Sequence, residues 1–426
     1  MNVHLKKLKY FFSMLQNQRF PYLKLREIQN RKLKSLIHNA YYHVPYFHDL
    51  MNSVQLKPHQ VQSTEDLRKI PLTTKKDLQR CDPSYYIDKR INPSQCKQIT
   101  TSGSTGIPLK FHFSKTDFSV LSMNWVRPLL FHGVKPWHRK LEITGPHNIS
   151  ETEKWYQHLG FFKTKKISVF NTPSEWSKAW NAFQPNFLYG YSGSLKLFAK
   201  HILEQNIVDI NPKYIFGVSE LVDKQCREWI YSAFHKKIID LYGAVESGCI
   251  AWECSVCQGY HINMDTVIVE FLKSGVPVPP GSSGNIFITN LHSFASPIIR
   301  YDLGDIAKLS ESRPICGLHL PLMQVIEGRS DAEVILPSGR SLSPLFFFGI
   351  MKPIKKINQW RVVQEGKNHW EISIVPQPDF KIETINQIQK RIEKNIKEDI
   401  QIKIKMIKHI PPDKSGKIRS VVSKVK

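Results

Sequence analysis

The chain contains the run Thr100-Thr101-Ser102-Gly103-Ser104-Thr105-Gly106-Ile107-Pro108, in which seven of nine residues are glycine, serine or threonine. The two glycines allow positive φ and a close approach of the backbone to a ligand. The hydroxyl and amide groups around them can point at phosphate oxygens. The run is not a Walker loop, because Ile107 and Pro108 stand where that motif has Lys and Ser or Thr. We therefore predict a phosphate-holding loop of another kind, with an ordinary surface turn as the alternative.

The bulk composition is typical of a globular enzyme. A chain of 426 residues has room for two or three domains, and its 41% hydrophobic and 11% aromatic content suits large cores. The longest apolar run, around Leu345–Phe348, is shorter than the roughly 18 residues that span a bilayer. The N-terminus is basic and lacks a signal-peptide pattern. We expect a cytoplasmic protein with no transmembrane segment.

The net charge of +24, with a pI near 9.6, predicts attraction to anions. Nucleic acid, membrane lipid, phosphorylated substrates and acidic proteins all carry suitable charge, and a surface of scattered lysines is the plainer alternative. No nucleic-acid-binding motif accompanies the charge, so no nucleic-acid partner is expected. Peripheral membrane contact stays open. Seven irregularly spaced cysteines argue against a disulfide scaffold.

Helical periodicity dominates the N-terminal part. Apolar residues in Arg31–Tyr46 recur at helical spacing and predict an amphipathic helix that ends before Pro45. Ser63–Arg80 predicts a second, interrupted helical segment. After the small-residue loop, Leu109–Phe113 alternates like a strand and Asp117–Leu130 indicates a helix. The loop is therefore expected at a turn before a strand.

The next part alternates short apolar strands with helices, which is the pattern of a layered α/β fold. The predicted strands are Leu141–Ile143, Phe187–Tyr189, Tyr214–Gly217 and Ile238–Leu241. Past Tyr260 the pattern changes to strands and turns, with strands predicted at Thr266–Leu272 and Asn285–Thr289. A β-rich subdomain is therefore expected after the α/β body.

From Gly328 onward the pattern indicates a separate α+β unit. A hairpin of Trp360–Gln364 and His369–Val375 precedes a helix with isoleucine at positions 385, 388, 392 and 396. An alternating strand then begins near Ile402. We predict two domains, residues 1–328 and 329–426.

Four further motifs each combine glycine with a charged group. They are Leu241–Gly248 (LYGAVESG), Arg300–Asp305 (RYDLGD), Gly328–Asp331 (GRSD) and Ser415–Arg419 (SGKIR). With the loop at residues 100–108, their order and spacing resemble the adenylate-forming enzymes, in particular the phenylacetate-CoA ligase branch and its CapK-like relatives. The resemblance covers nearly the whole chain. It implies a large N-terminal adenylation domain of layered α/β sheets with a β-rich subdomain, and a small, mobile α+β C-terminal domain.

The resemblance also implies a reaction, the ATP-dependent activation of a carboxylic acid as acyl-AMP with release of pyrophosphate, followed by transfer to CoA. The acid is expected to be an aryl or other small organic acid. The alternative acceptor is an acidic carrier protein, or an amine or hydroxyl of a surface polysaccharide precursor. A third hypothesis is a basic nucleic-acid- or membrane-binding protein on an inactive ligase fold, which the intact charged motifs disfavour.

Several residues would bind ATP according to the resemblance. The loop Thr101–Gly106 would hold the departing phosphates, and Glu246 would bind Mg²⁺, which suits a hard carboxylate oxygen. Tyr242 with Gly243 would lie against the adenine ring, and Asp305 would accept hydrogen bonds from the ribose. The alternatives are a surface carboxylate for Glu246 and a turn aspartate for Asp305.

The resemblance implies three roles in and around the C-terminal domain. Lys417 would be the catalytic lysine, whose charge stabilises the reacting α-phosphate, although an ordinary surface lysine is the alternative. Arg329 would donate to the ribose or a phosphate. Asp331 would be the hinge about which the domain swings between the two half-reactions.

The acid pocket is the least readable part of the sequence. Tyr189, Tyr191 and Ser192 belong to a segment that resembles the acid side of the family's site, and Gly217 ends the next predicted strand. The tyrosines are candidates for an aromatic pocket, with core packing as the alternative.

A candidate zinc site is read from cysteine spacing. Cys254, Cys257 and His261 have the spacing of three zinc ligands, and Cys316 is available as the fourth. A closed site of three cysteines and one histidine would be structural. Buried free cysteines with a solvated histidine are the alternative.

Overall fold

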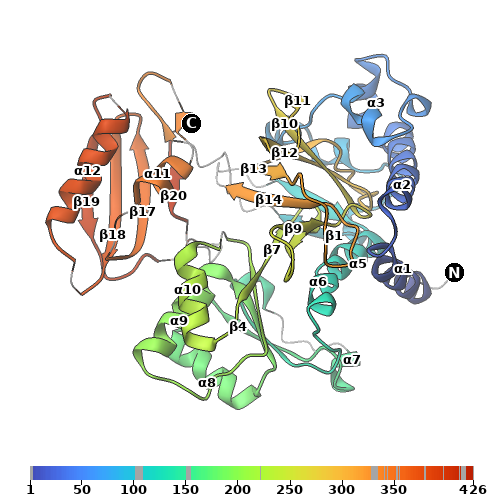
Figure 1. Cartoon of the computed structure of the whole chain (residues 1–426). Helices are drawn as coiled ribbons and strands as arrows, with labels where there is room; N and C mark the ends of the chain where they lie inside the picture. Colours follow the sequence, from blue (N-terminus) through green and yellow to red (C-terminus); the bar gives the residue numbers. More distant parts are fainter. Residues whose placement is uncertain are drawn as a thin grey trace.

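The computed structural model of the chain describes residues 3–100, 109–149, 155–220, 222–327, 334–339, 341–342, 344–351, 354, 356–378, 380–396, 398–411, 413 and 419–425. Figure 1 shows a large body and a smaller unit formed by the last part of the chain. Each has its own hydrophobic core, one running from Leu25 to Met323 and the other from Val334 to Val421. The division at 328 and 329 falls between these cores but outside the described residues, so it stays a prediction.

Three helices open the chain: α1 (Val3–Asn17), α2 (Tyr22–His43) and α3 (Pro45–Asn52). Helix α2 ends before Pro45 as predicted, because the residue preceding a proline disfavours helical backbone. It begins nine residues earlier than predicted, at Tyr22, since Leu25 and Ile28 extend its buried stripe.

The predicted segment Ser63–Arg80 contains a 3-10 helix, η2 (Thr64–Lys69), and a short helix, α4 (Lys75–Gln79). Each begins with a capping box, Ser63 with Asp66 and Thr74 with Asp77. The other 3-10 helices of this region are η1 (Pro58–Gln60), η3 (Pro83–Tyr86) and η4 (Pro93–Gln95).

An antiparallel hairpin of β1 (Lys97–Thr100) and β2 (Lys110–Phe113) places the small-residue loop between its strands. The strand predicted at residues 109–113 is thus confirmed. The helix expected over Asp117–Leu130 is instead two helices, α5 (Lys115–Asn124) and α6 (Val126–Phe131). They separate because Pro128 has no N–H to donate to the carbonyl group four residues earlier.

One twelve-stranded sheet spans the body, and its first half is parallel, in the order β7-β6-β5-β3-β4. The strands are β3 (Lys140–Thr144), β4 (Thr164–Ser168), β5 (Phe187–Tyr191), β6 (Tyr214–Val218) and β7 (Ile238–Ala244). The accompanying helices are η5 (Pro146–Asn148), α7 (Trp155–His158), α8 (Pro173–Phe183), α9 (Ser192–Glu204) and α10 (Lys224–Phe234). All four predicted strands are present, and only β4 was missed.

The other half of the sheet is antiparallel and forms the expected β-rich subdomain. Its strands are β8 (Gly248–Glu253), β9 (Tyr260–Ile262), β10 (Val267–Lys273), β11 (Val276–Pro277), β12 (Ser283–Asn290), β13 (Tyr301–Leu309) and β14 (Leu322–Glu327). Strand β7 joins the halves, because it pairs parallel with β6 and antiparallel with β8.

The C-terminal unit is a four-stranded sheet, ordered β19-β18-β17-β20. Its elements are β17 (Ile357–Gly366), β18 (His369–Pro376), α12 (Glu383–Ile396), β19 (Gln401–Met406) and β20 (Val421–Ser423). Before them come β15 (Val334–Ile335), β16 (Ser341–Leu342) and α11 (Pro344–Met351). Three of the four predicted isoleucines of α12, Ile388, Ile392 and Ile396, are buried in this core. Within the described residues, no helix combines the length and apolarity needed to cross a membrane.

Candidate active site

The carboxyl ends of β5, β6 and β7 lie side by side in the parallel half of the sheet. Tyr191 at the end of β5 pairs with Val218 of β6, which pairs with Leu241 of β7. In open α/β sheets, ligands bind beyond this edge of the strands. The edge therefore brings together the predicted acid-side segment and the motif that begins at Leu241.

Tyr242 and Asp305 make direct contact, although they come from different strands. The Tyr242 hydroxyl donates to Asp305 Oδ2 at 2.6 Å, joining β7 to β13. Three strands separate these two in the sheet order, and both side chains are half-buried. The residues predicted to hold the base and the sugar of a nucleotide thus lie in one site.

Glu246 lies in the tight turn between β7 and β8 and is 8% exposed. Its backbone carbonyl accepts from Asn290 Nδ2 at 2.8 Å, which ties the turn to β12. Gly243 has no room for a side chain, because a Cβ would lie 2.4 Å from the backbone oxygen of Gly248 and 2.6 Å from Trp125. The close approach at Gly243 and the bond from Asn290 therefore fix the backbone of the turn that carries Glu246.

Ser192 opens α9 at the edge of the sheet and is 1% exposed. Its hydroxyl has no hydrogen-bond partner in the structure as described. A Cβ on Gly217 would lie 2.6 Å from Ser192 Oγ, so glycine there lets β6 approach the start of α9. A buried hydroxyl without a hydrogen-bond partner is unfavourable in the ligand-free protein.

The two candidate tyrosines differ in position. Tyr191 is buried at the strand end, where burial raises the pKa of its hydroxyl. Tyr189 lies two residues further down β5, with Lys140 Nζ 4.6 Å from its ring centroid. Burial raises its pKa well above the usual value too. The structure thus brings Tyr191 to the same edge as Ser192 and Gly217, while Tyr189 faces the Lys140 side chain of β3.

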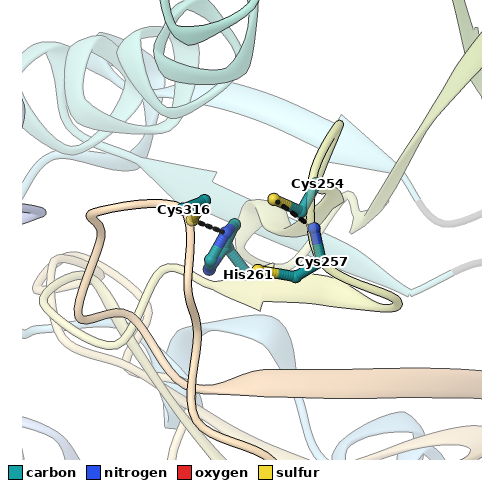
Figure 2. A group of neighbouring side chains, drawn as sticks. All are labelled: Cys254, Cys257, His261 and Cys316. Atoms are coloured by element: carbon teal, nitrogen blue, oxygen red, sulfur yellow. Dashed lines mark hydrogen bonds between the residues drawn. The ribbon is translucent and has the colours of Figure 1, made fainter.

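The four predicted zinc ligands form one cluster (Figure 2), in which their ligand atoms all lie within 4.8 Å of one another. Cys316 Sγ lies 3.2 Å from His261 Nε2. The backbone N–H groups of Val256 and Cys257 donate to Cys254 Sγ at 3.4 and 3.3 Å. N–H donors of this kind stabilise thiolates, which is the form that binds a metal.

His261 is oriented for metal binding. Its Nδ1 lies 3.0 Å from the carbonyl oxygen of Leu320 and donates there as the neutral tautomer, which leaves Nε2 facing the sulfurs. Burial lowers the pKa of His261 to about 4, so the ring is neutral near pH 7. Three cysteines and one neutral histidine fit a closed tetrahedral zinc site. Such an ion would tie the turn between β8 and β9 to the segment that follows β13.

Comparison with known proteins places this geometry among ligases. Residues 334–424 match the family model described as the CapK C-terminal domain. The phenylacetate-coenzyme A ligase of Thermus thermophilus is 25% identical over 454 residues, covering 94% of this chain and 97% of the relative. A solved 2-hydroxyisobutyryl-CoA ligase in the postadenylation state superposes with a TM-score of 0.76 at 17% identity, covering 96% of this chain and 91% of that one. The chain has the fold of the adenylate-forming CoA ligases.

Protein CapK of Staphylococcus aureus is a further relative, 22% identical over 303 residues, covering 68% of this chain and 64% of CapK. The resemblance to phenylacetate-CoA ligases and CapK is thus confirmed, as is the fold class of a large α/β domain followed by a small α+β domain.

Several predicted residues of this ligase fold lie outside the described residues. They are the loop Thr101–Gly106, Arg329, Asp331 and Lys417. The segment with Lys417 is flanked by Arg419, whose Nε lies 3.0 Å from Asp413 Oδ2. Their roles stay predictions.

Sequence reasoning missed two residues that shape this ligase site. Arg300 opens the motif that contains Asp305, and its Nη2 lies 2.8 Å from Glu270 Oε1, which anchors the start of β13. Glu220 Oε2 accepts from the backbone N–H of Gly193 at 2.6 Å, linking the end of β6 to α9. In the sequence, each of these residues is recognisable only as a charged residue next to an apolar strand. That position does not reveal the residue with which it pairs.

Proposed function

We propose that this chain is an ATP-dependent ligase that activates an organic acid, most suitably an aryl acid, as acyl-AMP and transfers the acyl group to CoA. The contact between Tyr242 and Asp305, with Glu246 in the turn that follows β7, is the observation that carries the proposal. A tyrosine ring and a carboxylate acceptor in contact after the parallel strands, where ligands bind in open α/β sheets, support a nucleotide site. Relatives named phenylacetate-CoA ligase support the reaction class.

Different residues of the site would bind different parts of ATP. The Tyr242 hydroxyl donates to Asp305 Oδ2 and so orients the carboxylate that would accept hydrogen bonds from the ribose hydroxyls. Glu246 would hold Mg²⁺, which when bound neutralises phosphate charge. The loop Thr101–Gly106 would cradle the departing pyrophosphate, and Lys417 would stabilise charge on the reacting phosphate.

The acid would lie beside the start of α9. Ser192 offers a buried hydroxyl that lacks a partner within the described structure. Tyr191, the last residue of β5, precedes it at the same edge of the sheet. A carboxylate or a hydroxyl of the acid would supply the missing hydrogen bond. Glycine at position 217 leaves room for the Ser192 hydroxyl, because a Cβ there would lie 2.6 Å from Ser192 Oγ.

We also assign a structural Zn²⁺ to Cys254, Cys257, His261 and Cys316. The ion would stabilise the β-rich subdomain without taking part in the reaction, because all four positions of a tetrahedral site are filled by the protein. The compartment that we propose is the cytoplasm, where ATP and CoA are available.

The first test is acid-dependent exchange of labelled pyrophosphate into ATP with a panel of aryl, fatty, amino and hydroxy acids. One acid class is expected to drive exchange, and Lys417→Ala is expected to lower its rate at least about 100-fold, as for lost transition-state electrostatics. Lys424→Ala is the matched control, because this lysine of the same domain pairs with the exposed Glu365 and has no assigned role in the reaction. Exchange that persists in Lys417→Ala would contradict the assigned role.

The acceptor is tested separately. The net charge of +24 also suits an acidic carrier protein, or a precursor of a surface polysaccharide in a phosphorylated form, as acceptor. CoA carries phosphates too, so charge does not distinguish these acceptors. Acid-dependent thioester formation with CoA as the sole acceptor would support the ligase. Robust pyrophosphate exchange without thioester formation would favour the other acceptors.

A further inference from the structure

The first two helices carry an excess of positive charge that the proposed reaction does not use. Residues 1–44 contain nine Lys or Arg and a single acidic residue, Glu27, which leaves +8 of the total +24 in about a tenth of the chain. In Figure 1, α1 and α2 lie at the side of the body away from the C-terminal unit. This charge is therefore concentrated on one side of the protein.

A cavity of about 490 Å³ opens between α1 and α2. Four cationic side chains line it, Lys9 from α1 and Lys24, Arg31 and Lys32 from α2. None of the described residues that line it is acidic. Lys32 lies at its inner side, where Nζ donates to the backbone oxygen of Asp265 at 2.6 Å. The cavity is thus a cationic recess whose inner amine is held in place by the body.

Apolar groups accompany this charge. Phe20 and Ile28 line the same cavity. Phe12 of α1 is 60% exposed, and Tyr22 and Leu23 at the turn into α2 are 49% and 76% exposed. Cations beside exposed leucine and aromatic side chains are typical of segments that lie in a membrane interface.

We propose that the α1–α2 surface, formed by residues 9–32, docks this protein on a bilayer that contains anionic phospholipid, with a lipid phosphate in the cavity. Charge complementarity favours an anionic bilayer as the binding partner, because anionic headgroups attract clustered Lys and Arg. A second copy of the chain would bring equal positive charges together. Single-stranded nucleic acid stacks its bases on aromatic side chains, and such binding gives no reason for an exposed aliphatic side chain such as Leu23. This docking does not depend on the proposed function.

The test is sedimentation of the full chain with vesicles. Neutral phosphatidylcholine vesicles are compared with vesicles that also contain phosphatidylglycerol, at 0.1 M and 0.5 M salt. We expect binding to the anionic vesicles only, and weaker binding at high salt, because salt screens the attraction. The proposal would be overturned if the protein sedimented with neither kind of vesicle at 0.1 M salt.

The decisive variant is Lys9→Glu/Arg31→Glu, with Lys236→Glu/Lys237→Glu as a control of equal charge on the exposed turn between α10 and β7. One removed cation weakens partitioning about fivefold, so the first variant is expected to lose at least about 25-fold and the control much less. Equal losses in both variants would mean that diffuse net charge, not this surface, causes binding. Loss of RNA binding in the first variant, with no vesicle binding by the wild type, would assign the surface to nucleic acid.

The contribution of the apolar groups is tested by Leu23→Ser. Val208→Ser is the matched control, since Val208 is 93% exposed on another part of the body. Leu23→Ser is expected to weaken vesicle binding several-fold and Val208→Ser to leave it unchanged. Pyrophosphate exchange should be unchanged in all of these variants, which shows that each one is folded and that docking and catalysis are separate. No effect of Leu23→Ser would refute insertion of the turn.

Discussion

At the scale of single residues, the site depends on groups whose partners come from distant parts of the chain. Tyr242 meets Asp305 across 63 positions in sequence, and Gly217 is required because Ser192 and Ile238 leave no space for a Cβ. Ser219 adopts a φ of +69°, a left-handed conformation that costs about 1 kcal/mol for a residue with a side chain. Ser219 follows directly on the carboxyl end of β6, the edge at which ligands bind in open α/β sheets.

Replacing Ser192 is expected to affect the stability of the protein and its binding of the acid in opposite directions. Its hydroxyl is buried with no partner among the described residues, so Ser192→Ala is expected to raise the free energy of unfolding of the ligand-free protein by about 1 kcal/mol. The same change removes a donor to the acid, so the KM for the acid should rise about tenfold while the KM for ATP stays the same. Thermal unfolding and exchange kinetics measure the two effects.

Ser194→Ala on the first turn of the same helix is the matched control, because Ser194 is also buried but is not among the residues that we assign to the acid site. A Ser192→Ala protein that loses stability without any change in the KM for the acid would show that the hydroxyl serves the fold alone.

At the scale of elements, two turns of the β-rich subdomain depend on the cysteine cluster. The turn between β8 and β9 contributes Cys254 and Cys257, and the segment between β13 and β14 contributes Cys316. Ile315 N–H donates to Cys257 Sγ at 3.3 Å, so backbone contacts already link the two segments. A metal ion would convert these contacts into a rigid tie.

We expect one zinc ion per chain, measured by elemental analysis of the purified protein. Removing it with a chelator should lower the melting temperature by roughly 5–10 °C, because a structural site contributes several kcal/mol and each kcal/mol shifts a large domain by about 2–4 °C. Cys257→Ser should lose the zinc, whereas Cys96→Ser, at a cysteine outside the cluster, should retain it. Full zinc content in Cys257→Ser would refute the assigned ligand set.

At the scale of the whole molecule, each of the two units has a hydrophobic core of its own, and we expect the two to fold separately. Between the two units, Gln225 Nε2 donates to the carbonyl oxygen of Ile357 at 3.4 Å. A hydrogen bond of this length is near the upper limit of the distance range and contributes little to holding the units together. Movement of the smaller unit during the reaction is compatible with this arrangement.

A fragment of residues 1–328 is therefore expected to fold, to bind ATP and to lose pyrophosphate exchange, since Lys417 is absent. Circular dichroism, calorimetric ATP titration and the exchange assay measure these three properties. Full-length Lys417→Ala is the comparison, because it should show the same pattern with both units present. Exchange by the fragment would place the catalytic lysine elsewhere, and a fragment that does not fold would contradict the domain boundary.

The sequence by itself determined the local elements, the two-part architecture and the types of residue at the site. Periodicity, caps and proline positions act over a few residues, so the end of α2, the caps of η2 and α4, and the strands β3, β5, β6 and β7 follow from neighbouring residues alone. The spacing of Cys254, Cys257 and His261 likewise indicated a metal site before their distances were known.

Only the tertiary structure decided which residues meet. The contact of Tyr242 with Asp305, the approach of Cys316 to His261 and the cationic cavity between α1 and α2 all depend on the order of strands and on helix packing. These arrangements are set by long-range burial of apolar surface, which is not encoded in the spacing of nearby residues. The same physical reason explains why the partners of Arg300 and Glu220, and the burial of the Ser192 hydroxyl, could not be predicted from their sequence neighbours.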